Sequence, residues 1–172
     1  MGITQLIFFA MMIGACCYAA VRGGAPERLT AAALVAALAM TMVFAHFRSP
    51  RHGAYSTVEV GIASTDLTLF LVIVAIALVS TRFWPVLMAS MMGCGLFGHL
   101  TKPLGPDILN RAYYIAVAFW SYPELTLLAV ATWRHRVRLK RYGVDYAWMW
   151  QLPRRYRNGW SVDELARPLP QN

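Results

Sequence analysis

Two long apolar runs around one short corner constrain this chain more than any other feature. The runs cover residues 67–80 and 86–100, and the corner between them reads Thr-Arg-Phe-Trp-Pro. In lipid, a helix satisfies all of its backbone hydrogen bonds within the segment, so each run is expected to be a membrane-buried helix. A corner this short makes the two helices antiparallel neighbours. The sequence therefore predicts a transmembrane helical hairpin.

The composition extends this prediction to the whole chain. Of the 172 residues, 58% are hydrophobic and 14% are charged, whereas charged residues make up about 25% of a soluble domain. Further apolar stretches approach the roughly 20 residues that cross a bilayer. We therefore expect an all-α integral membrane bundle of five transmembrane helices in one domain over residues 1–133, with spans at about residues 3–21, 29–47, 60–81, 85–100 and 112–133.

The start of the third span has two candidate signals. Residues 56–59 read Ser-Thr-Val-Glu, which matches a capping box ahead of an apolar run. That cap would start the helix near Thr57 and place Glu59 and Asp66 on one helical face. A cap at Ser64 would instead leave Asp66 in the first turn, where a carboxylate is favoured by the helix dipole. Both starts remain open.

The basic residues predict the orientation of the bundle. The tail, residues 134–172, holds nine Lys or Arg residues against three Asp or Glu residues. With this tail inside the cell, twelve of the 16 basic residues lie on the cytoplasmic side and four lie outside. The positive-inside rule therefore places the N-terminus outside and the C-terminus inside.

The tail itself is basic and rich in aromatic residues. Its first part is expected to extend the fifth helix as far as Gly143, since glycine commonly ends helices. The arginines and aromatics beyond it are typical of an interfacial segment. Nucleic acid is not the expected partner. The residues expected to bind anionic lipid headgroups or a protein partner are Arg134, Arg136, Arg138, Lys140, Arg141, Arg154, Arg155 and Arg157.

Glu124 is the strongest candidate for a functional side chain. It lies near the middle of the fifth span, next to Pro123, where a kink is expected. An ionised carboxylate at that depth is costly, and such residues are functional candidates by default. The alternative is structural: Glu124 bonds across helices or to backbone groups that Pro123 leaves free.

A second group of polar residues is expected in the outer half of the membrane. It forms either an outward-facing pocket or an ion pair of Lys102 with Asp66 or Asp107. His46 and His99 would permit ligation of a b-type haem. Neither these histidines nor the three cysteines show metal-ligand spacing, so we expect no metal and no cofactor. The candidate intramembrane site residues are Glu124, Asp66, Glu59, His99 and His46.

The cysteines all lie within apolar runs. Cys16, Cys17 and Cys94 show no spacing of a disulfide framework. We expect them to be buried thiols that pack as small hydrophobic side chains.

Four motifs carry a resemblance over about residues 23–143. They read VEVGIASTDLTLF, TRFWPVLMAS, GHLTKPLGPDILNRAY and WSYPELTLLAVATWRHR. With these motifs the chain resembles a group of small, uncharacterised, multi-span inner-membrane proteins of alphaproteobacteria. The resemblance implies the bacterial inner (plasma) membrane, and it transfers no catalytic residue.

No catalytic motif accompanies these features. The sequence has no nucleophile elbow, phosphate-binding loop or dinucleotide-binding glycine motif. The expected function is that of a non-enzymatic accessory or partner-binding membrane subunit, with a protein partner or a homo-oligomer. One alternative is a small transporter or proton-conducting oligomer that uses an intramembrane carboxylate. A second alternative is a b-type haem redox protein.

Overall fold

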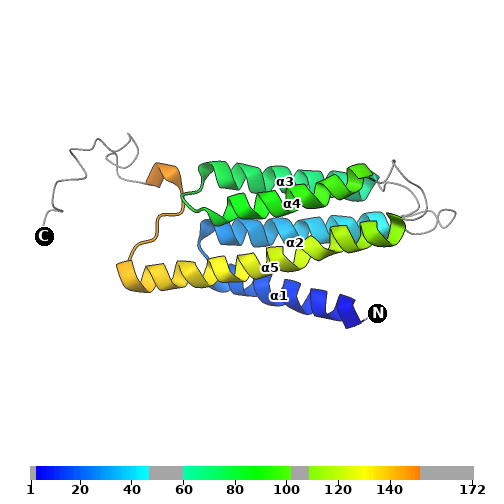
Figure 1. The fold of residues 1–172 in the computed structure, drawn as a ribbon. Coiled ribbons are helices and arrows are strands. Elements are labelled where there is room, and N and C mark those ends of the chain that lie inside the picture. Colours follow the sequence, from blue (N-terminus) through cyan, green and yellow to red (C-terminus); the bar gives the residue numbers. More distant parts are fainter. Residues whose placement is uncertain (1–2, 47–59, 102–108, 152–172) are drawn as a thin grey trace, which may run out of the picture.

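The structure is a computed structural model that describes residues 3–46, 60–101 and 109–151. Within these ranges the chain is helical and contains no β-strand (Figure 1), which confirms the expected all-α class. The α-helices are α1 (Ile3–Arg22), α2 (Ala25–His46), α3 (Val60–Val79), α4 (Trp84–Thr101) and α5 (Leu109–Tyr142), and a short 3-10 helix, η2 (Met149–Gln151), follows them.

Three of these helices are long and apolar enough to cross a membrane. They are α1, α2 and α3, and α4 contributes a shorter apolar stretch, Trp84–Phe97. Their outer surfaces carry many exposed large apolar side chains, for example Ile13, Leu71 and Leu78. A helix that is apolar on all sides is typical of a membrane span. These features indicate a membrane protein.

The five helices pack as a closed ring in chain order. Each helix contacts the next one along the chain, and α5 closes the ring by packing against α1. The helices run lengthwise side by side (Figure 1), and α3 and α4 are antiparallel neighbours. The antiparallel pairing of the predicted hairpin is therefore confirmed.

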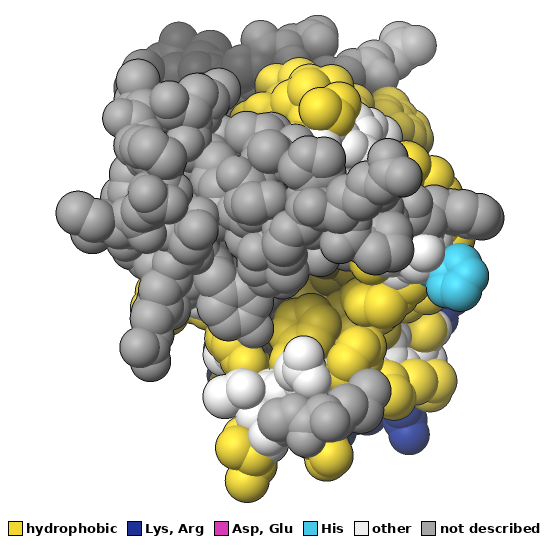
Figure 2. Space-filling model, turned by 90° about the vertical axis from the view of Figure 1, so that its right-hand side faces the viewer, with side chains coloured by type: hydrophobic (Ala, Val, Ile, Leu, Met, Phe, Trp, Pro, Cys, Tyr) yellow, Lys and Arg dark blue, Asp and Glu magenta, His cyan; other side chains and the backbone are white. Residues whose placement is uncertain are grey.

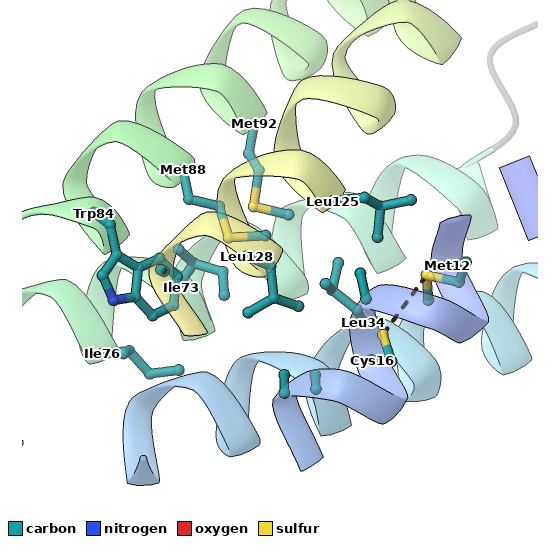
Figure 3. Close-up of a cluster of buried hydrophobic side chains, with 14 of the residues drawn as sticks. Met12, Cys16, Leu34, Ile73, Ile76, Trp84, Met88, Met92, Leu125 and Leu128 are labelled. Carbon is teal, nitrogen blue, oxygen red and sulfur yellow. Dashed lines mark hydrogen bonds between the residues drawn. The ribbon is translucent and has the colours of Figure 1, made fainter. Parts of the chain in front are cut away.

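The centre of the ring is filled by apolar side chains from all five helices. Ile73, Met88 and Leu128 are fully buried there, and Trp84, Leu34 and Leu125 extend the same cluster (Figure 3). Small residues such as Ala19 and Ala31 lie in this cluster where helices approach closely. The ring is thus held together along its length by close packing.

The cysteines correct one expectation. Cys16 is buried and lies 3.9 Å from the sulfur of Met12. Cys17 and Cys94 are exposed on the outer faces of α1 and α4, although all three thiols are free. Adjacent residues of a helix point in different directions, so Cys16 and Cys17 cannot both face the core.

Two helix boundaries bear on the sequence predictions. The alternative prediction that Ser64 caps the start of α3 is wrong, because the helix already includes Val60. The Ser64 hydroxyl instead donates to the Gly61 carbonyl within the helix, at 2.8 Å. The earlier cap at residues 56–59 lies outside the described residues. The predicted stop at Gly143 is confirmed: Gly143 has a φ of 72° and donates its amide to the Leu139 carbonyl at 3.0 Å.

The connection between α1 and α2 is tight enough to require glycine. The amide of Gly23 donates to the Ala19 carbonyl at 2.8 Å, closing the last turn of α1. A Cβ atom at Gly23 would lie 2.4 Å from that same carbonyl oxygen. The Ala19 carbonyl belongs to the helix backbone, so it cannot move away from an added Cβ as a flexible side chain could.

We therefore expect Gly23→Ala to lower the free energy of unfolding by about 1–3 kcal/mol, the usual cost of overpacking. Gly14→Ala is the matched control, because a Cβ there meets nothing within 4 Å and alanine favours helix. Reversible unfolding in detergent micelles measures both. Equal stability of the two variants would contradict the close approach.

Candidate functional site

Charged side chains from four parts of the chain gather at one end of the bundle. At this end α2 begins, α3 ends, α4 begins and α5 ends (Figure 1). We call the group the ion cluster. It consists of Glu27, Arg82, His135, Arg138 and Asp145. Glu27 is 0% exposed and Arg82 is 7% exposed, so the pair lies fully inside the protein.

Local backbone structure brings Glu27 to this place. The carbonyl of Gly24 accepts the first hydrogen bond of α2 from the Arg28 amide, at 3.0 Å. Glu27 then falls in the first turn, where the helix dipole favours a negative charge. A Cβ at Gly24 would lie 3.1 Å from side-chain atoms of Arg82, Glu27 and His135. The glycine therefore lets the backbone lie directly against the cluster.

Arg82 joins the two carboxylates of the cluster. Its Nη1 donates to Oε1 of Glu27 in a short contact, and its Nη2 donates to Oδ2 of Asp145 at 2.9 Å. The indole Nε1 of Trp84 donates to the same Glu27 oxygen at 3.2 Å. Glu27 and Asp145 are thereby connected through one guanidinium.

Asp145 accepts hydrogen bonds from three side chains. Nδ1 of His135 lies 2.5 Å from Oδ2 of Asp145, and Nε of Arg138 donates to Oδ1 at 3.1 Å. At that distance from a carboxylate, Nδ1 carries a hydrogen and donates it. Nη2 of Arg82, 3.0 Å from Nδ1, is therefore a second donor to Asp145, not a donor to the ring.

The pKa of Asp145 follows from these contacts. Burial by itself would raise the pKa, but the hydrogen bonds from His135 and Arg138 and the charges of Arg82 and Arg138 lower it below the usual value. The carboxylate is therefore ionised at neutral pH. The stabilising contribution of the carboxylate is fully present above the pKa of an aspartate in the unfolded chain, about 3.9. The contribution is lost as the pH falls through the lower pKa of Asp145 in the folded protein.

The ion cluster holds the chain beyond α5 against the bundle. We call residues 144–151 the return segment, because it crosses the bundle end from α5 to the α3–α4 corner (Figure 1). The Thr81 hydroxyl donates to the Tyr146 carbonyl at 2.7 Å, and the Thr81 amide donates to the Ala147 carbonyl at 3.2 Å. The rings of Trp148 and Trp150 stack with centroids 5.2 Å apart. Ionic and backbone contacts thus fix the same segment.

Three buried polar atoms of this end have no hydrogen-bond partner among the described residues. They are Oε2 of Glu27, Oγ1 of Thr30 and Nε of Arg82. Each charged group of the cluster nevertheless faces an opposite charge. The arrangement therefore holds four parts of the chain together.

The predicted intramembrane carboxylates lie elsewhere, inside the bundle. Glu124 of α5 is 8% exposed, and Asp66 of α3 lies close enough for the two carboxylates to interact electrostatically. The two carboxylates come from helices that are not neighbours in the ring. Helix α5 continues through Pro123 without a break.

The other intramembrane candidates are not assembled into a described site. His46 is exposed at the end of α2, while Glu59 and the side chain of His99 lie outside the described residues. Lys102 and Asp107 also lie outside them. Figure 2 views the bundle from the end opposite the ion cluster, where α2 ends and α5 begins. The described side chains visible there are mainly hydrophobic, with no Asp or Glu among them.

The predicted tail residues divide into two groups. Arg138 belongs to the ion cluster, whereas Arg134, Lys140 and Arg141 are exposed and Arg136 is partly exposed on α5. Arg154, Arg155 and Arg157 lie outside the described residues. The expected domain boundary at residue 134 falls inside α5, which continues to Tyr142.

Sequence reasoning missed Glu27, Arg82, His135 and Asp145 as a group. A signal was present, because the expected topology already placed the α1–α2 turn, the α3–α4 corner and the tail on one side of the membrane. Acidic residues are scarce, 8 in the whole chain, and four of them (Glu27, Asp145, Asp163 and Glu164) fall in these segments together with most of the basic residues. With 16 basic residues against 8 acidic ones in the chain, an acidic residue in these segments is expected to pair with a basic one.

Comparisons with protein families, with curated proteins and with solved structures find no match. The fold and the site define the class of protein by themselves. The chain is an all-α membrane protein whose bundle is closed at one end by a buried ion cluster.

We expect Glu27→Gln to lower the free energy of unfolding by about 3–5 kcal/mol, because it leaves the Arg82 charge buried with one carboxylate fewer. Glutamine has nearly the shape of glutamate, so packing is preserved. Arg141→Gln, an exposed site on α5, should change stability by less than about 0.5 kcal/mol. Unfolding titrations in micelles compare the two. Equal effects would show that the cluster does not stabilise the fold.

Proposed function

We propose that this chain is a non-enzymatic subunit of a bacterial inner membrane that works by binding a partner protein. The observation that carries the proposal is the return segment, which the ion cluster holds at the end of the bundle. A buried ion pair such as that of Glu27 and Arg82 is costly to form. The ion pairs of the cluster join separate parts of the chain, so its benefit lies in fixing a surface.

The proposal includes five membrane crossings with the N-terminus outside and the C-terminus inside. The packing of α4 and α5 alongside the three apolar helices supports five crossings. In the count of basic residues, the α1–α2 turn, the α3–α4 corner and the tail lie on the same side of the membrane. The ion cluster supports this placement, because it joins these three segments at one end of the bundle. The excess of basic residues at that end then favours the cytoplasm.

The proposed contact surface lies on the return segment. Tyr146, Met149 and Trp150 are exposed there, beyond the end of the helical bundle. Aromatic and methionine side chains are enriched in protein interfaces, and tryptophan is prominent among hot spots. The exposed Arg134, Lys140 and Arg141 add positive charge on the last turns of α5, at the same end of the bundle. We therefore propose a cytoplasmic or membrane partner with an acidic rim.

A photo-crosslinking residue at Met149 tests the proposed surface in cells. We expect one partner to be captured in stoichiometric amount, and Trp150→Ala to reduce the capture at least tenfold, the loss for a hot spot of about 1.4 kcal/mol. Trp133→Ala, an exposed tryptophan in the helical part of α5, is the matched control and should leave it unchanged. Equal capture by both variants, or an activity retained by the purified chain alone, would contradict the proposal.

A second candidate function rests on a separate observation. Glu124 is buried in the bundle with Asp66 near it, and paired intramembrane carboxylates occur in proton pathways. A bundle this small would form such a pathway as a homo-oligomer.

In this case Glu124→Gln should abolish proton flux into liposomes while protein expression stays normal. Thr126→Val is the control, because among the described residues the Thr126 hydroxyl bonds to the Tyr122 carbonyl of its own helix, at 3.0 Å. A pH-sensitive dye inside the liposomes reports the flux. Flux that is the same in wild type and Glu124→Gln would remove this candidate.

A further inference from the structure

A groove of about 320 Å³ opens beside the ion cluster, between α4 and α5. One part of its lining is basic and consists of Arg82, Arg134 and Arg138. The other part is apolar and includes Leu87, Leu127 and Val130. We call it the arginine groove. Its two halves differ sharply in chemistry, which suggests a ligand with two matching halves.

The two halves are arranged along the helix axis. Leu127, Val130, Arg134 and Arg138 follow one another at spacings of three and four residues, so they form one stripe on α5. The stripe runs from apolar residues within the bundle to arginines at its end. The basic half therefore lies toward the C-terminal end of α5 from the apolar half.

The basic half keeps unused capacity for an anion. Arg134 is exposed and makes no ion pair with any described residue. The Arg82 side chain is 4% exposed, yet its Nε has no hydrogen-bond partner within the described ranges. Three guanidinium groups line the groove against one carboxylate, that of Asp145. An incoming anion would meet a positive local field.

The apolar half is open to the surroundings of the bundle. Leu87 and Val130 are 40% and 45% exposed, and Phe83 beside the groove is 70% exposed. A free phosphate ion would leave this half uncovered. A hydrocarbon chain would cover it along the direction of the stripe.

We propose that the arginine groove binds one anionic phospholipid. Its phosphate lies at Arg134 and Arg138 with Arg82 behind them, and one acyl chain lies along Val130, Leu127 and Leu87. Basic pockets between membrane helices on the cytoplasmic side are a known means of binding anionic headgroups. The site is distinct from the proposed partner surface, since Tyr146, Met149 and Trp150 do not line the groove.

Native mass spectrometry of the delipidated full chain tests the site with defined lipids. Phosphatidylglycerol and phosphatidylcholine with identical acyl chains are titrated separately. We expect one phosphatidylglycerol to be retained with at least tenfold preference over phosphatidylcholine. Arg134→Gln should weaken that binding about fivefold or more, the order expected for one basic residue near a membrane surface. Because Arg134 is exposed and makes no ion pair with a described residue, the variant should remain folded.

Two controls make the test decisive. Arg141→Gln removes a charge from the same helix outside the groove lining and should leave binding unchanged. Val130→Trp keeps every charge but fills the apolar half, and should also abolish binding. Equal weakening by Arg134→Gln and Arg141→Gln would overturn the site in favour of unspecific attraction. Competition by millimolar inorganic phosphate, or full binding by Val130→Trp, would overturn the lipid as ligand.

Discussion

The bridge from Glu27 through Arg82 to Asp145 is the interaction on which the end of this bundle depends. It joins the first turn of α2, the α3–α4 corner and the chain beyond α5, three segments that are far apart in sequence. A guanidinium suits the position, because its planar fork offers separate donors to two carboxylates. Removing Arg82 would leave the buried Glu27 carboxylate without an opposite charge, and removing either carboxylate would leave Arg82 with one partner fewer. The cluster therefore acts as a unit.

The bundle and the cluster stabilise the protein by different physics. Between helices in lipid, close packing supplies the attraction, and the ring has a centre filled by Ile73, Met88 and Leu128. At the bundle end the helices separate into turns and the chain must satisfy polar backbone. There the ion pairs and the bonds of Thr81 to the return segment replace packing. Close packing thus stabilises the helical part of the bundle, and ion pairs and hydrogen bonds stabilise its end.

Much of the fold could be predicted from local sequence, but the individual contacts of the ion cluster could not. Apolar runs indicated the helices, the short corner indicated the α3–α4 pair, and Gly143 indicated the end of α5. These features depend on neighbouring residues. The ion cluster depends on residues 27, 82 and 145 meeting in space, which requires the ring order of the helices. The direction of single side chains, as at Cys16 and Cys17, depends on the same packing. Glu124 could be singled out because a carboxylate in an apolar span is unusual by itself.

The sharing of residues between the ion cluster and the arginine groove links the two. Arg82 and Arg138 both bind Asp145 and both line the groove. A phosphate that draws Arg138 toward the groove would compete with Asp145 for its guanidinium. Arg82, held by Glu27 on its other side, would keep the return segment in place during that exchange. Arg138 would then exchange one anion for another, while the bridge from Glu27 through Arg82 to Asp145 stays unchanged.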